Sequence, residues 1–110
     1  MKRLAGQRVH SLRDVREAVS LRRGGRAQVL EYQAGHQWLT LRLVKPGLAG
    51  NFHLRCGACE RVTFETQWEP ASVEVEEAAH GFVVHDGAHL RVECGLVEGE
   101  YNVPPVFGLG

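Results

Sequence analysis

The sequence predicts an α+β fold: a mostly antiparallel β-sheet with an N-terminal helix, a second short helix and a CxxC zinc-knuckle hairpin. The strongest indication is strict alternation along residues 37–44, where three leucines share one face. A second indication is the helical spacing of the apolar residues that follow Ser11. The chain has 110 residues, of which 44% are hydrophobic, and this suits a single domain over residues 1–110.

The first helix is expected directly after a basic arm. Residues 1–10 show no periodicity, so we assign them to the arm. Ser11 can cap a helix, and Asp14 follows three residues later, close to the pattern of a capping box. Gly24-Gly25 is expected to end the helix.

About four strands are then expected to form an antiparallel meander. The first two cover residues 27–33 and 37–44. The other two are the arms of a hairpin, one over residues 52–55 and one starting at Arg61. The link between these arms is Cys56-Gly57-Ala58-Cys59, a knuckle that directs both thiols to the same place.

Residues 71–79 fit two structures. Val73 and Val75 alternate as in a strand, whereas Ser72 as a cap and the acidic residues behind it fit a short helix. We favour the helix.

The C-terminal region is expected to contain a hairpin and a tail. Strands over residues 82–84 and 88–94 are joined at His85-Asp86-Gly87, because Asp-Gly is a strong hairpin signal. Prolines exclude regular structure from residues 101–110, which form an extended apolar tail.

Three cysteines are candidate ligands for a structural zinc ion: Cys56, Cys59 and Cys94. The fourth ligand is expected to be a histidine, and His53 and His89 are the candidates. One CxxC pair is a weak signal by itself. Because the cysteines share strand faces with apolar residues, the alternative is that they are buried core thiols.

The charge of the chain is divided between its two halves. Residues 1–55 hold eleven Lys or Arg and three acidic residues, a net charge of +8, while residues 56–110 hold two and ten, a net charge of −8. Folding either interleaves these charges on one surface or leaves a basic face. A basic face would bind nucleic acid, or the acidic half of a second copy.

Nucleic-acid or partner binding would use the arginines of the basic half on phosphates. These candidates are Arg3, Arg8, Arg13, Arg16, Arg22, Arg23 and Arg26. The alternative is a head-to-tail contact between oppositely charged halves, as in a structural assembly protein of a virion, ring or filament.

Several functional classes are not expected. The chain has no nucleophile motif with a base at a diagnostic spacing and no phosphate-binding glycine loop, so we do not expect an enzyme. It has no apolar run of membrane-spanning length, and the start is not of signal-peptide type. We expect a cytoplasmic protein, or a component of a particle assembled inside the cell.

Residues 52–96 resemble the C-terminal dimerisation domain of the ferric uptake regulator family. The similar segments are His53-Leu54-Arg55-Cys56-Gly57-Ala58-Cys59-Glu60-Arg61-Val62 and His80-Gly81-Phe82-Val83-Val84, followed by His89, Gly95 and Leu96. The resemblance implies a zinc-stapled dimerisation unit of a DNA-binding transcription regulator. The chain departs from the family at Val97, where a further cysteine is expected, and it lacks the N-terminal winged-helix domain.

Together these observations predict a small non-enzymatic binding module with an optional structural zinc. We expect it to form homo-oligomers and to contact a protein or nucleic acid.

Overall fold

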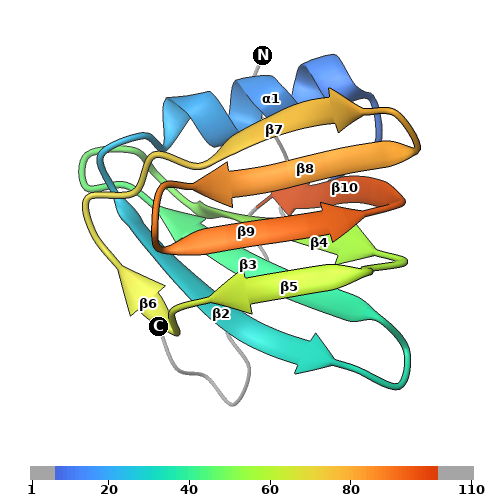
Figure 1. The fold of residues 1–110 in the computed structure, drawn as a ribbon. Helices are drawn as coiled ribbons and strands as arrows, with labels where there is room; N and C mark the ends of the chain where they lie inside the picture. The colour runs from blue at the N-terminus through green and yellow to red at the C-terminus, as the bar shows by residue number, and fades with distance from the viewer. Residues whose placement is uncertain (1–6, 102–110) are drawn as a thin grey trace.

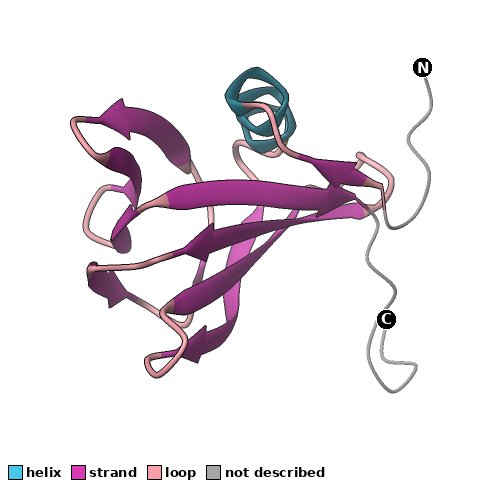
Figure 2. Ribbon diagram, turned by 90° about the vertical axis from the view of Figure 1, so that its right-hand side faces the viewer, coloured by secondary structure: helices cyan, strands magenta, loops and turns pink. Residues whose placement is uncertain are grey.

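Two antiparallel β-sheets face each other, and one helix lies over the opening between them (Figures 1 and 2). This arrangement is that of a computed structural model, which describes residues 7–101. The elements are β1 (Arg8–Val9), α1 (Leu12–Leu21), β2 (Arg26–Gln33), β3 (Trp38–Val44), β4 (Asn51–Gly57), β5 (Arg61–Phe64), β6 (Gln67–Trp68), β7 (Glu74–Ala78), β8 (Gly81–Asp86), β9 (Leu90–Cys94) and β10 (Leu96–Tyr101).

The larger sheet has the strand order β1-β10-β4-β3-β2-β6, and the smaller has the order β5-β9-β8-β7. The chain passes between the sheets four times: after β4, after β5, after β6 and after β9. Backbone hydrogen bonds show the second passage clearly: the amide of Glu65 donates to the carbonyl of His89, next to β9 of the smaller sheet, and the carbonyl of Thr66 accepts from the amide of Val29 in the larger one, each at 2.8 Å. The two sheets are therefore held together by continuous chain as well as by side chains.

The core lies between the sheets and follows the strand period of two. Leu39, Leu41 and Leu43 are buried on the inner face of β3, as their alternation predicts. Leu41 is paired with Leu54 of β4, and Val92 of β9 belongs to the same buried cluster. Each fully buried aliphatic side chain of this kind contributes about 2 kcal/mol to stability.

The first helix forms where the sequence predicts it. The Ser11 side chain accepts a hydrogen bond from the Asp14 amide at 3.1 Å, which caps the N-terminus. The face with Val15, Ala18 and Val19 is buried, and the helix contacts β10, β7 and β4.

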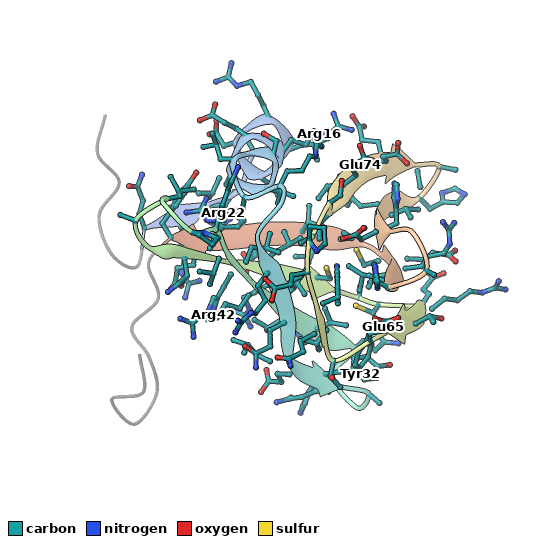
Figure 3. The ribbon with its side chains drawn as sticks, turned by 90° about the vertical axis from the view of Figure 1, so that its left-hand side faces the viewer. Arg16, Arg22, Tyr32, Arg42, Glu65 and Glu74 are labelled. Carbon is teal, nitrogen blue, oxygen red and sulfur yellow. The ribbon has the colours of Figure 1, made fainter. Side chains whose placement is uncertain are left out.

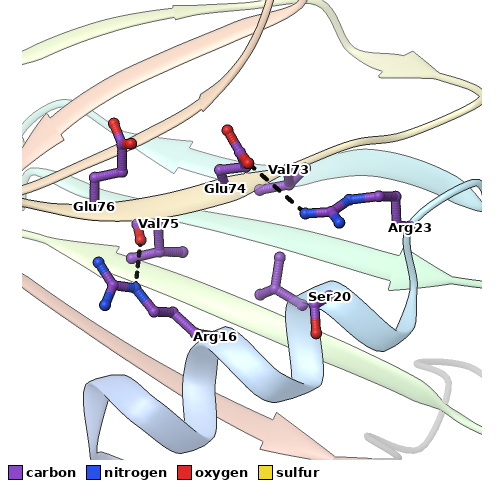
Figure 4. Close-up of a pocket in the computed structure, with 8 residues that line it drawn as sticks. Arg16, Ser20, Arg23, Val73, Glu74, Val75 and Glu76 are labelled. Carbon is purple, nitrogen blue, oxygen red and sulfur yellow. Dashed lines mark hydrogen bonds and ion pairs between the residues drawn. The ribbon is translucent and has the colours of Figure 1, made fainter.

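The helix also protects the edge of the smaller sheet. The Nε of Arg16 donates to the carbonyl oxygen of Val75 in the edge strand β7 at 2.8 Å, and Arg23 lies 3.7 Å from Glu74 (Figure 4). A hollow of about 260 Å³ remains between α1 and β7. An edge strand covered in this way is less open to pairing with another chain.

The prediction of a second helix over residues 71–79 is wrong. Residues 74–78 form strand β7, in which Val75 is paired with Val84 of β8. Val73 and Val75 are both buried, so packing of their alternating side chains outweighed the local capping signals. The hairpin predicted at Asp86-Gly87 is confirmed by the pairing of β8 with β9.

The prediction that β4 and β5 form a hairpin around the CxxC link is also wrong. β4 pairs with β3 and β10 in the larger sheet, while β5 pairs with β9 in the smaller one. The Cys56–Cys59 link therefore joins two sheets instead of two neighbouring strands. The four-stranded meander is correspondingly limited to β2, β3 and β4.

The ends of the described chain pair with each other. Arg8 and Val9, within the predicted arm, form β1 and pair with β10. Tyr101 belongs to β10, which the sequence did not predict because Gly95 and Gly99 weaken the strand signal. A Cβ at Gly99 would overlap the Phe52 ring, so this position requires glycine. The rest of the predicted arm and tail lies outside the described residues.

Asp86 connects the smaller sheet to residues 68–72, where the chain leaves the larger one. Its Oδ2 accepts hydrogen bonds from Trp68 Nε1 at 2.7 Å and from the amide of Ser72 at 2.6 Å. Asp86 and Trp68 are both buried, so the bond between them is protected from water, whereas the bond to Ser72 is partly buried.

We expect Asp86→Ala to lower the free energy of unfolding by about 3 kcal/mol, because the buried indole N–H of Trp68 and the partly buried amide of Ser72 lose their shared acceptor. Urea denaturation of both proteins measures the change. Glu77→Ala is the matched control: Glu77 is exposed on β7 and its side chain makes no hydrogen bond or ion pair to a residue in the range 7–101, so the effect should stay within about 0.5 kcal/mol. Equal effects of the two substitutions would contradict the role of Asp86.

Candidate functional site

The three cysteines meet where the chain passes between the sheets. Cys56 lies near the end of β4, Cys94 ends β9, and Cys59 lies in the link after β4; all three are buried and free. The amide of Gly95 donates to the carbonyls of Gly57 at 3.0 Å and Ala58 at 3.2 Å. The residues that follow Cys56 and Cys94 are thus hydrogen-bonded, which places the two cysteines side by side. We call Cys56, Cys59 and Cys94 the thiol corner.

The three thiols differ in acidity. A hydrogen bond between the side chains of Cys56 and Cys94 raises the pKa of Cys56, together with its burial, and lowers the pKa of Cys94. Burial raises the pKa of Cys59 to about 11, and its Sγ donates to the carbonyl oxygen of Cys56 at 3.3 Å. Cys94 is therefore the member of the corner that ionises most readily.

Neither histidine that we predicted as a zinc ligand lies at the thiol corner. His53 points to the opposite side of β4 from Cys56, because the two residues are three apart in a strand. His89 precedes β9, whereas Cys94 ends it; the His89 ring stacks on Trp68 with a centroid separation of 5.5 Å, and its Nδ1 lies 2.8 Å from a Glu65 carboxylate oxygen. Within residues 7–101, no three His, Cys, Asp or Glu side chains are grouped to hold a metal ion.

The arginines predicted to bind nucleic acid do not form one surface. Arg3 lies outside the described residues, and each of the other six has a contact inside the chain. These contacts are Arg8 with Glu100 at 3.6 Å, Arg13 with Asp14 at 3.8 Å, Arg16 with the Val75 carbonyl at 2.8 Å, Arg22 with the Ala18 carbonyl at 3.0 Å, Arg23 with Glu74 at 3.7 Å and Arg26 with Glu69 at 4.0 Å. Arg22 is also buried, with its Cζ 5.6 Å from the centre of the Phe52 ring.

The oppositely charged halves of the sequence are interleaved by folding. Four ion pairs join residues of the first half to residues of the second: Arg8–Glu100, Arg23–Glu74, Arg26–Glu69 and Arg55–Glu98. His10 Nδ1 also lies 3.6 Å from a Glu98 carboxylate oxygen. Folding thus places basic residues of the first half beside acidic residues of the second half of the same molecule.

The outward side of the larger sheet carries a continuous polar surface. The strand register aligns one row of side chains across this sheet: Arg8, Glu100, His53, Arg42, Gln28 and Gln67. A neighbouring row contains Glu98, Arg55, Thr40 and Glu31. We call these two rows the polar face. Figure 3 shows Arg42 on the side of the larger sheet that faces away from Glu74 and Glu65.

Arg42 and His53 are unusual members of the polar face. They are paired in register and both are half-buried. Neither side chain makes a hydrogen bond or ion pair with any residue in the range 7–101. Arg42 Nε and His53 Nε2 are inaccessible to water and have no partner there. Burial, and then the charge of Arg42, lowers the pKa of His53 to about 4, so the imidazole is neutral at pH 7.

Two hollows flank this pair. The larger, of about 350 Å³, is lined by Arg26, Gln28, Arg42, Val44, Pro46 and Glu69. The smaller, of about 220 Å³, is lined by Glu31, Thr40, His53, Arg55 and Glu100. The larger hollow combines the donors of Arg26, Gln28 and Arg42 with an apolar wall of Val44 and Pro46. The smaller hollow has no apolar wall and contains two carboxylates, those of Glu31 and Glu100.

Sequence reasoning missed Arg42 and Arg55 as functional candidates. Both lie on the polar sides of predicted strands, and Arg55 stacks over Trp38 with its Cζ 4.7 Å from the ring centre. The alternation of β3 and β4 placed these arginines outward, but it could not show which of them would find a carboxylate partner.

No protein-family model, curated protein or solved structure matches the chain. The resemblance to the ferric uptake regulator family stays a prediction, and the candidate sites rest on their geometry. In the part of the chain that the structure describes, no helix has the length and apolar character needed to cross a bilayer.

The low pKa of His53 predicts a pH dependence of stability. The unfolded chain binds a proton near the ordinary value of 6.5, while the folded chain resists it until about 4. The free energy of unfolding therefore falls as the pH drops from about 6.5 towards 4, because the unfolded chain takes up a proton that folded His53 resists. Above pH 6.5 the imidazole is neutral in both states, and this loss of stability is absent.

We expect His53→Gln to lose less stability than the wild type between about pH 7.5 and pH 5 in urea denaturation. His36→Gln is the control, because His36 is exposed in the β2–β3 turn, and this variant should follow the wild type. A His53 ring resonance that titrates near 6.5 would contradict the shift.

Proposed function

We propose that the chain is a small non-enzymatic binding module that holds an acidic side chain of a protein partner in the larger hollow of the polar face. The observation that carries this proposal is Arg42, a half-buried arginine without a carboxylate partner in the described chain. Its cross-strand neighbours are Gln28 and His53, and neither carries a negative charge. Its charge is therefore available to a ligand.

The hollow is suited to the whole of an acidic side chain. The guanidinium of Arg42 offers several donors in one plane, which is the geometry that a carboxylate accepts best. Gln28 adds an amide donor beside it, while Val44 and Pro46 supply apolar contact for the methylene groups of a Glu or Asp. A bound carboxylate would also offset the cost of keeping Arg42 partly buried and unpaired.

A protein partner fits this face better than nucleic acid does. Glu31, Glu98 and Glu100 are interspersed with the arginines of the polar face, and Glu69 lines the hollow itself. A polyanion with evenly spaced phosphates would meet these carboxylates, whereas a protein surface can match an alternation of charges. The arginines of the basic half are also engaged in contacts inside the chain.

The head-to-tail assembly of basic and acidic halves is not favoured, because four ion pairs between the halves already lie within one molecule. A structural zinc is left out of the proposal, since the predicted histidine ligands lie away from the thiol corner.

Hexaglutamate is a suitable probe, and hexaglutamine is its uncharged counterpart. We expect hexaglutamate to shift the amide resonances of β2 and β3 saturably in heteronuclear NMR, and hexaglutamine to leave them unchanged. Arg42→Gln should weaken this binding about tenfold or more, because it removes a charge-assisted hydrogen bond. Arg61→Gln is the matched control: Arg61 is exposed on β5 in the other sheet and should bind as the wild type does.

Two results would overturn the proposal. One is hexaglutamate binding that Arg42→Gln and Arg61→Gln reduce equally, which would indicate attraction by net charge alone. The other is tighter binding of an oligothymidylate of about ten nucleotides at the same salt concentration, which would assign the polar face to single-stranded nucleic acid.

A further inference from the structure

We propose that Cys94 and Cys56 are a peroxide-sensitive thiol pair that closes to a disulfide between the two sheets. This is independent of the proposed binding function, because the thiol corner lies on the core side of β4 and the polar face lies on the other side.

The fold places the two thiols in position. Cys56 belongs to the larger sheet and Cys94 to the smaller, and the Gly57–Gly95 backbone hydrogen bond of 3.0 Å holds the two strand ends together. β4 and β9 contact each other, and each of these two thiols shifts the pKa of the other. We expect two thiols held at hydrogen-bonded strand ends to be able to approach to the S–S bond length of about 2.05 Å.

Access favours Cys94 as the thiol that reacts first. Cys94 lines a surface hollow of about 220 Å³ together with Glu60, His80, Phe82 and Glu93, and Cys56 does not line it. A small peroxide can enter such a space. The hydrogen bond from Cys56 also lowers the pKa of Cys94, which increases the fraction present as the nucleophilic thiolate.

Cys59 is not expected to take part. Its thiol is directed to the carbonyl oxygen of Cys56 at 3.3 Å, and burial raises its pKa to about 11. It therefore stays protonated while Cys94 and Cys56 react, and it serves as an internal control.

The reaction has two steps. In the first, the Cys94 thiolate attacks one oxygen of hydrogen peroxide, the O–O bond breaks, and the products are Cys94 sulfenic acid and hydroxide. In the second, the Cys56 sulfur attacks the Cys94 sulfur, and the sulfenic oxygen leaves as water after taking up a proton. In sum, two thiols and one hydrogen peroxide give one disulfide and two waters, and a dithiol reductant reverses the change by exchange.

The disulfide would join β4 to β9 and close the loop of residues 56–94. Cross-linking residues far apart in sequence restricts the unfolded chain and so raises stability. The oxidised protein should melt about 5 °C or more above the reduced protein. Oxidation would thus lock the two sheets against each other at the corner where the chain passes between them.

Peptide mapping of the full chain tests the proposal. The reduced protein is treated with hydrogen peroxide, remaining thiols are alkylated, and the peptides are separated without reductant. We expect one linked product that contains Cys56 and Cys94 and is lighter by two hydrogens, with Cys59 alkylated. Dithiothreitol should restore three alkylated cysteines. Cys59→Ser should give the same link, whereas Cys94→Ser should give none.

Other outcomes would overturn the proposal. A Cys56–Cys59 link would assign the chemistry to the CxxC pair. Oxidation of Cys94 to sulfinic acid without a disulfide would show that Cys56 cannot reach it. Zinc present in an equal amount to the purified chain, and released when the thiols are alkylated, would show that the thiols are metal ligands. If a cysteine variant fails to fold, the peptide map of the wild-type protein still identifies which cysteines are linked.

Discussion

The pleat of β4 is the constraint on which both candidate sites depend. Successive side chains of a strand point to opposite sides, so Leu54 and Cys56 enter the core while His53 and Arg55 lie on the polar face. β4 is also central in the larger sheet, between β3 and β10, and its register fixes the neighbours of each side chain. The buried thiol of Cys56 and the half-buried imidazole of His53 are therefore close in sequence but lie on opposite sides of one strand.

The passages between sheets give the fold its second organising feature. Short links after β4 and β9 meet at one corner, where Gly95 donates to the carbonyls of both Gly57 and Ala58. Ala58 has a φ of 52°, in the left-handed region, which lets the link turn sharply from one sheet into the other. Cysteines 38 positions apart in the chain become neighbours because two turns, each unremarkable by itself, hydrogen-bond to each other.

Signals that act over a few residues were predicted well. Capping by Ser11, the alternation of the β3 leucines and the Asp-Gly hairpin depend on local conformation, and all three are present. Residues 71–79 show where such signals fail, because a cap and a strand pattern overlap there and the burial of Val73 and Val75 favours the strand. The CxxC hairpin failed for a different reason: adjacent strands in sequence need not be partners in a sheet.

The candidate sites show the same division. Residue types, spacing and strand parity predicted that the thiols lie on apolar faces and that Arg42 lies on a polar one. The nearness of Cys94 to Cys56, the distance of both histidines from them and the lack of a carboxylate beside Arg42 arose only from folding. Side-chain direction follows from the backbone period, which is local. Neighbours across strands depend on how the whole chain packs its core, because pairing partners distant in sequence are chosen by burial and register together.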